Sequence, residues 1–231
     1  MAGVRQVFAR SVADGCTETK RFSFGIDDID ADPRDDEPVS SRTSTLRLGI
    51  DLDGVVADFS AGWIARFNRD HGTSLTVEDV TEWDAPMLLT GFADIDEFWS
   101  WFATAGDTGG SIFADLDPYP GALEALHRLA GHGHELVVLS TKPDFAVHET
   151  YRWLAHHGFP SREIHLLDDK ANVECDVYLD DADHNLEALT QRRPDALVCR
   201  YVRPWNRPWQ RAVDVHGWHD FEQVVDSTPR R

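Results

Sequence analysis

Cysteine is scarce in this sequence of 231 residues, and no two cysteines form a short metal-binding pair. The three cysteines, Cys16, Cys175 and Cys199, are widely spaced. An odd number at this spacing fits neither a disulfide framework nor a zinc site built from paired cysteines. We therefore expect reduced thiols and a reducing compartment.

Long apolar runs are also missing. No run approaches the ~20 residues that a membrane-spanning helix needs, and the N-terminal region has no stretch typical of a secretory signal peptide. The sequence therefore predicts a soluble, cytoplasmic protein that does not bind a membrane.

Positively charged residues are also few. Lys and Arg total 22 against 41 Asp and Glu, which gives a net charge of -19. Such an excess repels nucleic-acid backbones and anionic lipids, so we expect no nucleic-acid polymer as a partner. The hydrophobic content of 42% can build a core, and the length allows one domain with a small insert. The composition leaves a homodimer open.

The first 45 residues differ from the rest in composition. Seven acidic residues lie between Asp27 and Glu37, and residues 40–45 are all polar. High charge with little apolar surface cannot offset the entropy of ordering, so residues 1–45 are predicted to form a disordered, acidic leader. An acidic interaction tail, or a start codon placed too far upstream, would give the same pattern.

Five short apolar runs, rich in Val, Ile and Leu, predict strands that are buried on both faces. They cover residues 46–54, 134–141, 163–167, 176–180 and 196–201. Amphipathic helices are predicted at residues 121–130, 145–157, 184–191 and 218–225. This alternation indicates an α/β fold with a Rossmann-like parallel sheet and helices on both faces.

Residues 59–115 interrupt the alternation. They have no strand pattern, predict helices at 60–70, 77–83 and 95–105, and contain four of the eight tryptophans. We expect a small helical cap inserted after the first strand, between core segments 46–58 and 116–231. For any single tryptophan of the cap, packing in the interior is the more common role.

Polar residues follow the predicted strands at one edge of the sheet, where ligands of open parallel sheets bind. These residues are Asp51, Asp53, Ser140, Thr141, Asp168, Asp169, Lys170, Asp180 and Asp181. Carboxylates this close repel one another and raise each other's pKa, which a divalent cation relieves. Hard oxygen ligands favour Mg²⁺.

This set of residues suits phosphoryl transfer, in which catalysis consists mainly of positioning and charge neutralisation. A carboxylate can attack phosphorus, while a hydroxyl and an ammonium hold the phosphoryl oxygens. Asp51 and Asp53 are two residues apart in an extended segment, so their side chains lie on one face. One can attack while the other donates a proton to the leaving oxygen and later activates water.

Each of these signals has a simpler explanation when it is taken alone. Residues 51–54 could be a turn, and a strand-terminal Ser or Thr usually caps the next helix. Asp180 and Asp181 could simply begin a helix. A calcium loop is excluded, because its sixth position would be Val56 instead of Gly and its twelfth Gly62 instead of Glu. The order of the signals along consecutive strands makes the pattern specific.

Four segments resemble motifs of the haloacid dehalogenase-like phosphatases, and more closely of the 5'(3')-deoxyribonucleotidase family. The first is the run DLDGVVADF at residues 51–59. Residues 137–141 followed by Pro143 resemble the second motif, Asp169-Lys170 the third, and residues 179–181 the fourth. The resemblance covers residues 46–225. It weakens in the cap and after the fourth motif, where Ala-Asp-His-Asn stands in place of a common Arg-Pro-Asp.

The resemblance implies Asp51 as the nucleophile and Asp53 as the general acid/base. It also implies that Mg²⁺ is held by the Asp51 carboxylate, the Asp53 backbone carbonyl and Asp181, with Asp180 behind them.

For the substrate, the resemblance implies that Thr141 and Lys170 bind phosphate, with Ser140 and Lys142 nearby. It further implies that aromatic residues of the cap cover the base and sugar. The candidates are Phe59, Trp63, Trp99 and Trp101.

The expected function is Mg²⁺-dependent hydrolysis of phosphomonoesters through an aspartyl-phosphate, with deoxyribonucleoside monophosphates as substrates. One alternative is a phosphatase of another small metabolite, such as a sugar phosphate or a phosphonate. A second is a protein that binds a phosphorylated ligand without hydrolysing it. Retention of Asp51, Asp53, Thr141, Lys170 and Asp181 favours an enzyme.

One further segment, residues 203–211, mixes basic and aromatic residues in the manner of a nucleic-acid contact. Its three arginines stand in a strongly acidic chain. We therefore interpret it as a packed loop that borders the active site.

Overall fold

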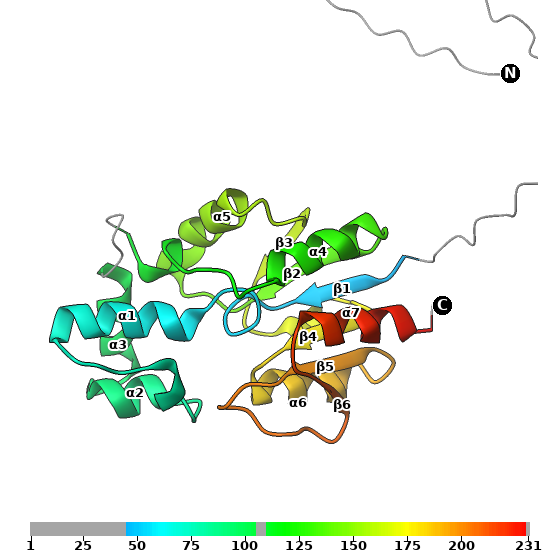
Figure 1. The fold of residues 1–231 in the computed structure, drawn as a ribbon. Helices are drawn as coiled ribbons and strands as arrows, with labels where there is room; N and C mark the ends of the chain where they lie inside the picture. The colour runs from blue at the N-terminus through cyan, green and yellow to red at the C-terminus, as the bar shows by residue number, and fades with distance from the viewer. Residues whose placement is uncertain (1–44, 105–109, 230–231) are drawn as a thin grey trace, which may run out of the picture. The chain divides into compact units, whose positions relative to one another are not determined.

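The computed structural model describes residues 45–104 and 110–229, so the predicted leader lies outside the described residues except for Thr45. A six-stranded sheet forms in the order β3-β2-β1-β4-β5-β6, and all neighbouring strands are parallel (Figure 1). The strands are β1 Arg47–Ile50, β2 Glu135–Ser140, β3 Glu163–Leu166, β4 Val177–Asp180, β5 Leu197–Tyr201 and β6 Ala212–Val215. The predicted parallel α/β fold is confirmed.

Helices cover both faces of this sheet, and alternate residues along a strand contact different helices. Val138 belongs to the cluster that includes side chains of α4 (Ala122–Gly131), α5 (Val147–His156) and α7 (Trp218–Ser227). Its neighbours Val137 and Leu139 pack instead with α6 (Asp183–Arg192). Strands buried on two faces explain why their sequences are continuous apolar runs. None of the helices in the described residues is long and apolar enough to cross a membrane.

Strand β6 was not predicted from the sequence. Its residues, Ala-Val-Asp-Val, do not form an apolar run, and the strand pairs only with β5 at the edge of the sheet. Pairing to β5 is reinforced by Arg200, whose guanidinium donates to both carboxylate oxygens of Asp214 at 2.7 and 2.6 Å.

The segment between β1 and α4 is helical in the described residues. It contains α1 (Phe59–His71), α2 (Ala85–Thr90) and α3 (Ile95–Thr104), which Figure 1 shows grouped at one end of the sheet. The helix predicted at 77–83 is wrong, because only a 3-10 turn forms at Val77–Asp79. A separate helix, α2, begins after Asp84 with Pro86 in its first turn, where a missing N–H costs nothing.

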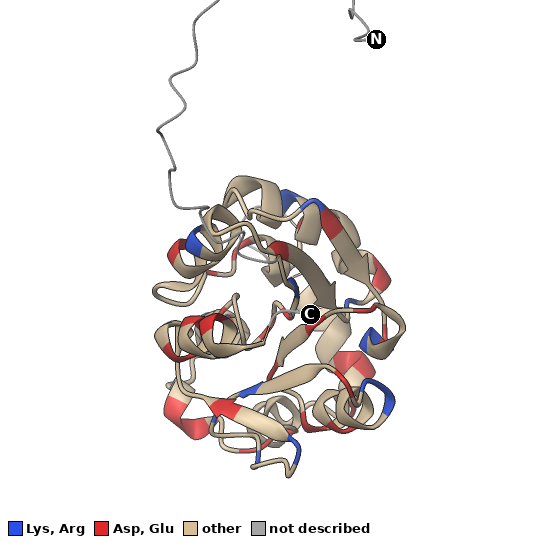
Figure 2. Ribbon diagram, turned by 90° about the vertical axis from the view of Figure 1, so that its right-hand side faces the viewer, with Lys and Arg blue, Asp and Glu red and all other residues tan. Residues whose placement is uncertain are grey.

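Acidic residues are not confined to one edge of the protein. Figure 2 shows them on helices and loops around the sheet, interspersed with fewer basic residues. The acidic residues at the carboxyl edge of the sheet therefore differ from the other acidic residues in being buried.

Candidate active site

The carboxyl ends of β1, β2 and β4 meet beneath α1–α3 and enclose a cavity of about 350 Å³. Residues expected from the sequence form its floor: Asp51, Asp53, Ser140, Thr141, Lys170 and Asp181. The cavity is large enough for a small organic ligand. Asp180 and Lys142 lie outside the cavity lining, behind the floor residues that they contact.

A tight turn follows β1 and brings its two carboxylates against the end of β4. The backbone carbonyl of Leu52 accepts N–H bonds from residues 55–57 at 3.2, 2.7 and 2.8 Å. Gly54 has a φ of 77°, and a Cβ there would lie 2.2 Å from Asp181 Oδ2. Only glycine permits this conformation together with this close approach.

Lys170 connects the carboxylates of two neighbouring strands. Its buried ammonium lies 2.9 Å from Asp51 Oδ1 and 2.6 Å from Asp180 Oδ2. Asp180 also accepts bonds from the Ala182 N–H at 2.9 Å and from Asn185 Nδ2 at 3.1 Å. Burial alone would lower the pKa of Lys170, but the charges of Asp180 and Asp51 outweigh it and raise this pKa. Lys170 is therefore held as a cation on the cavity floor.

Asp53 is paired with a second buried lysine. Lys142 Nζ donates to Asp53 Oδ2 at 2.5 Å, and the Lys142 side chain is 2% exposed. Burial lowers the pKa of Lys142, although the charge of Asp53 opposes this shift. This geometry favours a contact with Asp53 over the phosphate contact that the sequence suggested for Lys142.

The hydroxyl groups at the end of β2 differ in their bonding. Thr141 Oγ1 donates to the Leu167 carbonyl at 3.1 Å, which fixes its side chain. Ser140 is buried, and among the described residues its Oγ has no hydrogen-bonding partner. A ligand in the cavity is the natural partner for this hydroxyl.

Asp51, Asp180 and Asp181 each offer one carboxylate oxygen within 4.8 Å of the others. Burial raises the pKa of Asp51 to about 7, opposed by Lys170 and reinforced by the charges of Asp180 and Asp53. Burial and the charges of Asp51 and Asp180 likewise raise the pKa of Asp181. A divalent cation would remove this repulsion, and the all-carboxylate donor set suits one.

Within this cluster, the existing hydrogen bonds separate the three acids. Both oxygens of Asp180 already accept bonds from Lys170, Asn185 or a backbone N–H. Asp51 and Asp181 use one oxygen each, Asp51 Oδ1 toward Lys170 and Asp181 Oδ2 toward Trp205. The two remaining oxygens, one on each acid, are the better ligands for a cation.

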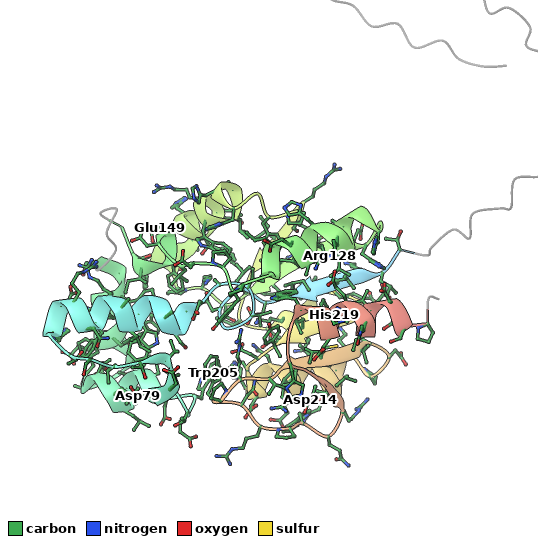
Figure 3. The ribbon with its side chains drawn as sticks, viewed as in Figure 1. Asp79, Arg128, Glu149, Trp205, Asp214 and His219 are labelled. Atoms are coloured by element: carbon green, nitrogen blue, oxygen red, sulfur yellow. The ribbon has the colours of Figure 1, made fainter. Side chains whose placement is uncertain are left out.

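The loop after β5 supports the site and was identified from the sequence only as a border. Trp205, labelled in Figure 3, donates its indole N–H to Asp181 Oδ2 at 2.8 Å. Asn206 Nδ2 donates to the backbone carbonyls of Asp181 and Tyr201, both at 2.8 Å. Arg203 Nε donates to the Gly54 carbonyl at 2.6 Å. No spacing rule in the sequence links these residues to Gly54 and Asp181, because the contacts span about two dozen residues or more.

Aromatic side chains form the roof of the cavity. Phe59, Trp63 and Trp99 line it as expected, and Trp83 and Phe98 line it as well. Trp101 does not: its indole N–H donates to Asp70 Oδ2 at 3.1 Å. Trp99 and Trp101 are two residues apart in α3, so they lie about 200° apart around the helix and face different directions.

Three polar atoms of the cavity-lining residues are buried without a partner among the described residues. They are Asp53 Oδ1, Ser140 Oγ and Trp63 Nε1. Buried polar atoms are rarely left unmatched, so an acceptor, a hydroxyl and a donor on residues that line one cavity favour a polar ligand.

Residues 45–229 match the family described as "5' nucleotidase, deoxy (Pyrimidine), cytosolic type C protein". The chain belongs to this 5'-nucleotidase family. It is therefore a phosphomonoester hydrolase with the haloacid dehalogenase-like fold, and the resemblance found in the sequence is confirmed.

Individual relatives of this nucleotidase are distant. The human cytosolic-type 5'(3')-deoxyribonucleotidase is 30% identical over 152 residues, which are 60% of this chain and 72% of the relative. A putative nucleotidase, OB0422, from Oceanobacillus iheyensis is 30% identical over 120 residues, or 48% of this chain, and the match spans 63% of its own length. A putative haloacid dehalogenase-like hydrolase, YfnB from Bacillus subtilis, solved bound to magnesium, superposes with a TM-score of 0.54 at 11% identity. That match covers 79% of this chain and 99% of the solved chain.

Proposed function

We propose that this nucleotidase hydrolyses deoxyribonucleoside monophosphates to the nucleoside and inorganic phosphate, with Mg²⁺ as cofactor and an aspartyl-phosphate on Asp51 as intermediate. The observation that carries the proposal is the floor of the cavity, where Asp51, its Lys170 partner at 2.9 Å and Asp53 meet beneath an aromatic roof. We further propose that residues 59–115 act as the cap over this floor.

In the first step, a carboxylate oxygen of Asp51 attacks phosphorus and the bond from phosphorus to the ester oxygen breaks. Asp53 donates a proton to the departing oxygen, which leaves as the nucleoside hydroxyl. The Lys170 ammonium, Thr141 and the unmatched Ser140 hydroxyl hold the phosphoryl oxygens.

In the second step, water attacks the phosphorus of the aspartyl-phosphate, and Asp53 accepts its proton. The bond between phosphorus and Asp51 breaks, which releases inorganic phosphate and restores the Asp51 carboxylate and the protonated Asp53. Asp51 and Asp181 would hold a divalent cation, which when bound neutralises the carboxylates and the phosphoryl oxygens. The packed rings of the roof, among them the fully buried Trp63 and Phe98, limit the access of other water to the floor.

The family and the aromatic roof both support the proposed substrate class. Phe59 and Trp99 line the cavity with partly exposed rings on which a nucleobase can stack, whereas Trp63 is fully buried beside them. The human relative is named a 5'(3')-deoxyribonucleotidase, which makes deoxyribonucleotides the first substrates to test.

The test is phosphate release in the presence of Mg²⁺, with dUMP and dTMP compared with UMP, a sugar phosphate and an aryl phosphate. We expect the highest kcat/KM with the deoxyribonucleotides. Hydrolysis of only the sugar or aryl phosphate would support phosphomonoester hydrolysis and reject deoxyribonucleotides as the substrates. If no compound released phosphate, both the proposed reaction and the proposed substrates would be rejected.

A further inference from the structure

Lys142 occupies an unusual position for a lysine. Only three lysines are present in the chain, and two of them, Lys142 and Lys170, are buried beside the carboxylates of the site. Burying an ammonium is energetically unfavourable unless it is paired. Lys170 contacts two carboxylates, whereas the one carboxylate that Lys142 contacts among the described residues is that of Asp53.

The side chain of Lys142 lies among aromatic and apolar residues. Its Nζ lies 4.0 Å from the centre of the Phe113 ring, over which a cation is attracted. With Asp53, Phe113, Leu116 and Trp153 it lines a small hollow of about 10 Å³, and Asp53 also lines the main cavity. The ammonium therefore acts on the site through its contact with Asp53.

The contact distinguishes the two oxygens of Asp53. An ammonium can only donate, so Oδ2 must accept from Lys142. The other oxygen, Oδ1, is buried without a partner among the described residues, although Asp53 lines the main cavity. Oδ1 is therefore the oxygen of Asp53 that has no other contact to compete with a transferred proton.

We propose that Lys142 is a positioning residue for the acid/base Asp53. It holds Oδ2 so that Oδ1 faces the substrate, delivers a proton to the departing ester oxygen, and later accepts a proton from the attacking water. Lys142 itself neither loses a proton nor touches the phosphoryl group. This inference rests on the proposed function, because it assigns a supporting residue to the same reaction.

The leaving group offers the sharpest test. A nucleoside hydroxyl is a poor leaving group and needs the proton from Asp53, whereas a nitrophenolate leaves without one. We expect Lys142→Met to lower kcat about 10- to 100-fold with the best nucleotide substrate, with a smaller loss for p-nitrophenyl phosphate. KM should change little, and Lys142→Gln, which keeps an N–H donor, should restore part of the rate.

A double-mutant cycle separates action through Asp53 from direct action. In an Asp53→Asn background, Lys142→Met should cause no further loss of kcat. Arg152→Met, which removes one exposed positive charge from α5, is the matched control and should leave kcat unchanged. Thermal unfolding of each variant shows whether it is folded.

Binding of inorganic phosphate to the folded variants, measured by calorimetry, needs no turnover. We expect wild type and Lys142→Met to bind phosphate with the same affinity. A tenfold weaker phosphate affinity, an equal loss of kcat for both leaving groups, or a full additional loss in the Asp53→Asn background would overturn the proposal. An inactive wild type would instead reject the proposed function, and the phosphate affinities would still test Lys142.

Discussion

The floor and the roof of the cavity are built by different kinds of contact. On the floor, ion pairs and hydrogen bonds of 2.5–3.1 Å fix carboxylates that extend from strand ends. In the roof, aromatic rings pack with centroids 5.2–6.2 Å apart, as for Phe98 with Trp99 and Trp63 with Phe98. The floor therefore holds individual atoms in place, whereas the roof sets a shape. We expect changes in the floor to affect kcat and changes in the roof to affect KM.

The largest effect should come from the floor. Asp51→Asn replaces the proposed nucleophile with a near-isosteric amide, so we expect kcat to fall about 1,000-fold or more. The roof is untouched, so the fold and the affinity for substrate should survive, as measured by thermal unfolding and by calorimetry with the nucleotide. Retained turnover in this variant would contradict the aspartyl-phosphate mechanism.

The next effect concerns the loop that supports the floor. Trp205→Phe removes the indole N–H that donates to Asp181 Oδ2 at 2.8 Å. Removing a partner that orients a metal-binding carboxylate typically lowers the affinity for the metal about 10- to 100-fold. We expect a loss of that size in the affinity for Mg²⁺. Measuring activity over a range of Mg²⁺ concentrations gives this affinity. Saturating Mg²⁺ should restore most of kcat. An unchanged Mg²⁺ requirement would show that Trp205 does not orient Asp181.

The pH dependence of the floor has a defined sign. The pKa of Asp51 in the folded protein is about 7, above its ordinary value of 3.8, and that of Asp181 is also raised. Their contribution to stability is therefore present at low pH and is lost as the pH rises through about 7 without metal. A cation competes with these protons, so we expect Mg²⁺ to raise Tm by several °C more at pH 8 than at pH 6. Equal shifts at the two pH values would contradict the assignment of these acids as the metal ligands.

The smallest effect should come from the roof. Trp63→Phe keeps a ring in the cavity but removes a buried indole N–H that has no partner among the described residues. If this N–H donates to the substrate, KM should rise roughly 2- to 10-fold with little change in kcat. Trp101→Phe is the control, because Trp101 bonds to Asp70 outside the cavity lining and should leave KM unchanged. Equal KM values for the two variants would remove Trp63 from substrate binding.

The same contrast explains what the sequence could and could not predict. Floor residues follow strands whose apolar runs are plain, so the parallel sheet brings Asp51, Ser140 and Asp181 to one edge. Roof residues depend on how short helices pack, which periodicity does not determine: Trp83 lies after a 3-10 turn where a helix was expected. The opposite directions of Trp99 and Trp101 were readable from helical geometry, whereas the contacts of Arg203 and Trp205 to the site were not.

The central claim is that Asp51 carries the phosphoryl group during turnover. Brief reaction with dUMP labelled with ³²P, followed by acid quenching and peptide mapping, tests this claim most directly. We predict a labelled peptide containing Asp51 in the wild-type protein and no label in Asp51→Asn. Release of labelled phosphate with no labelled protein at any reaction time, or a label on another residue, would contradict the account.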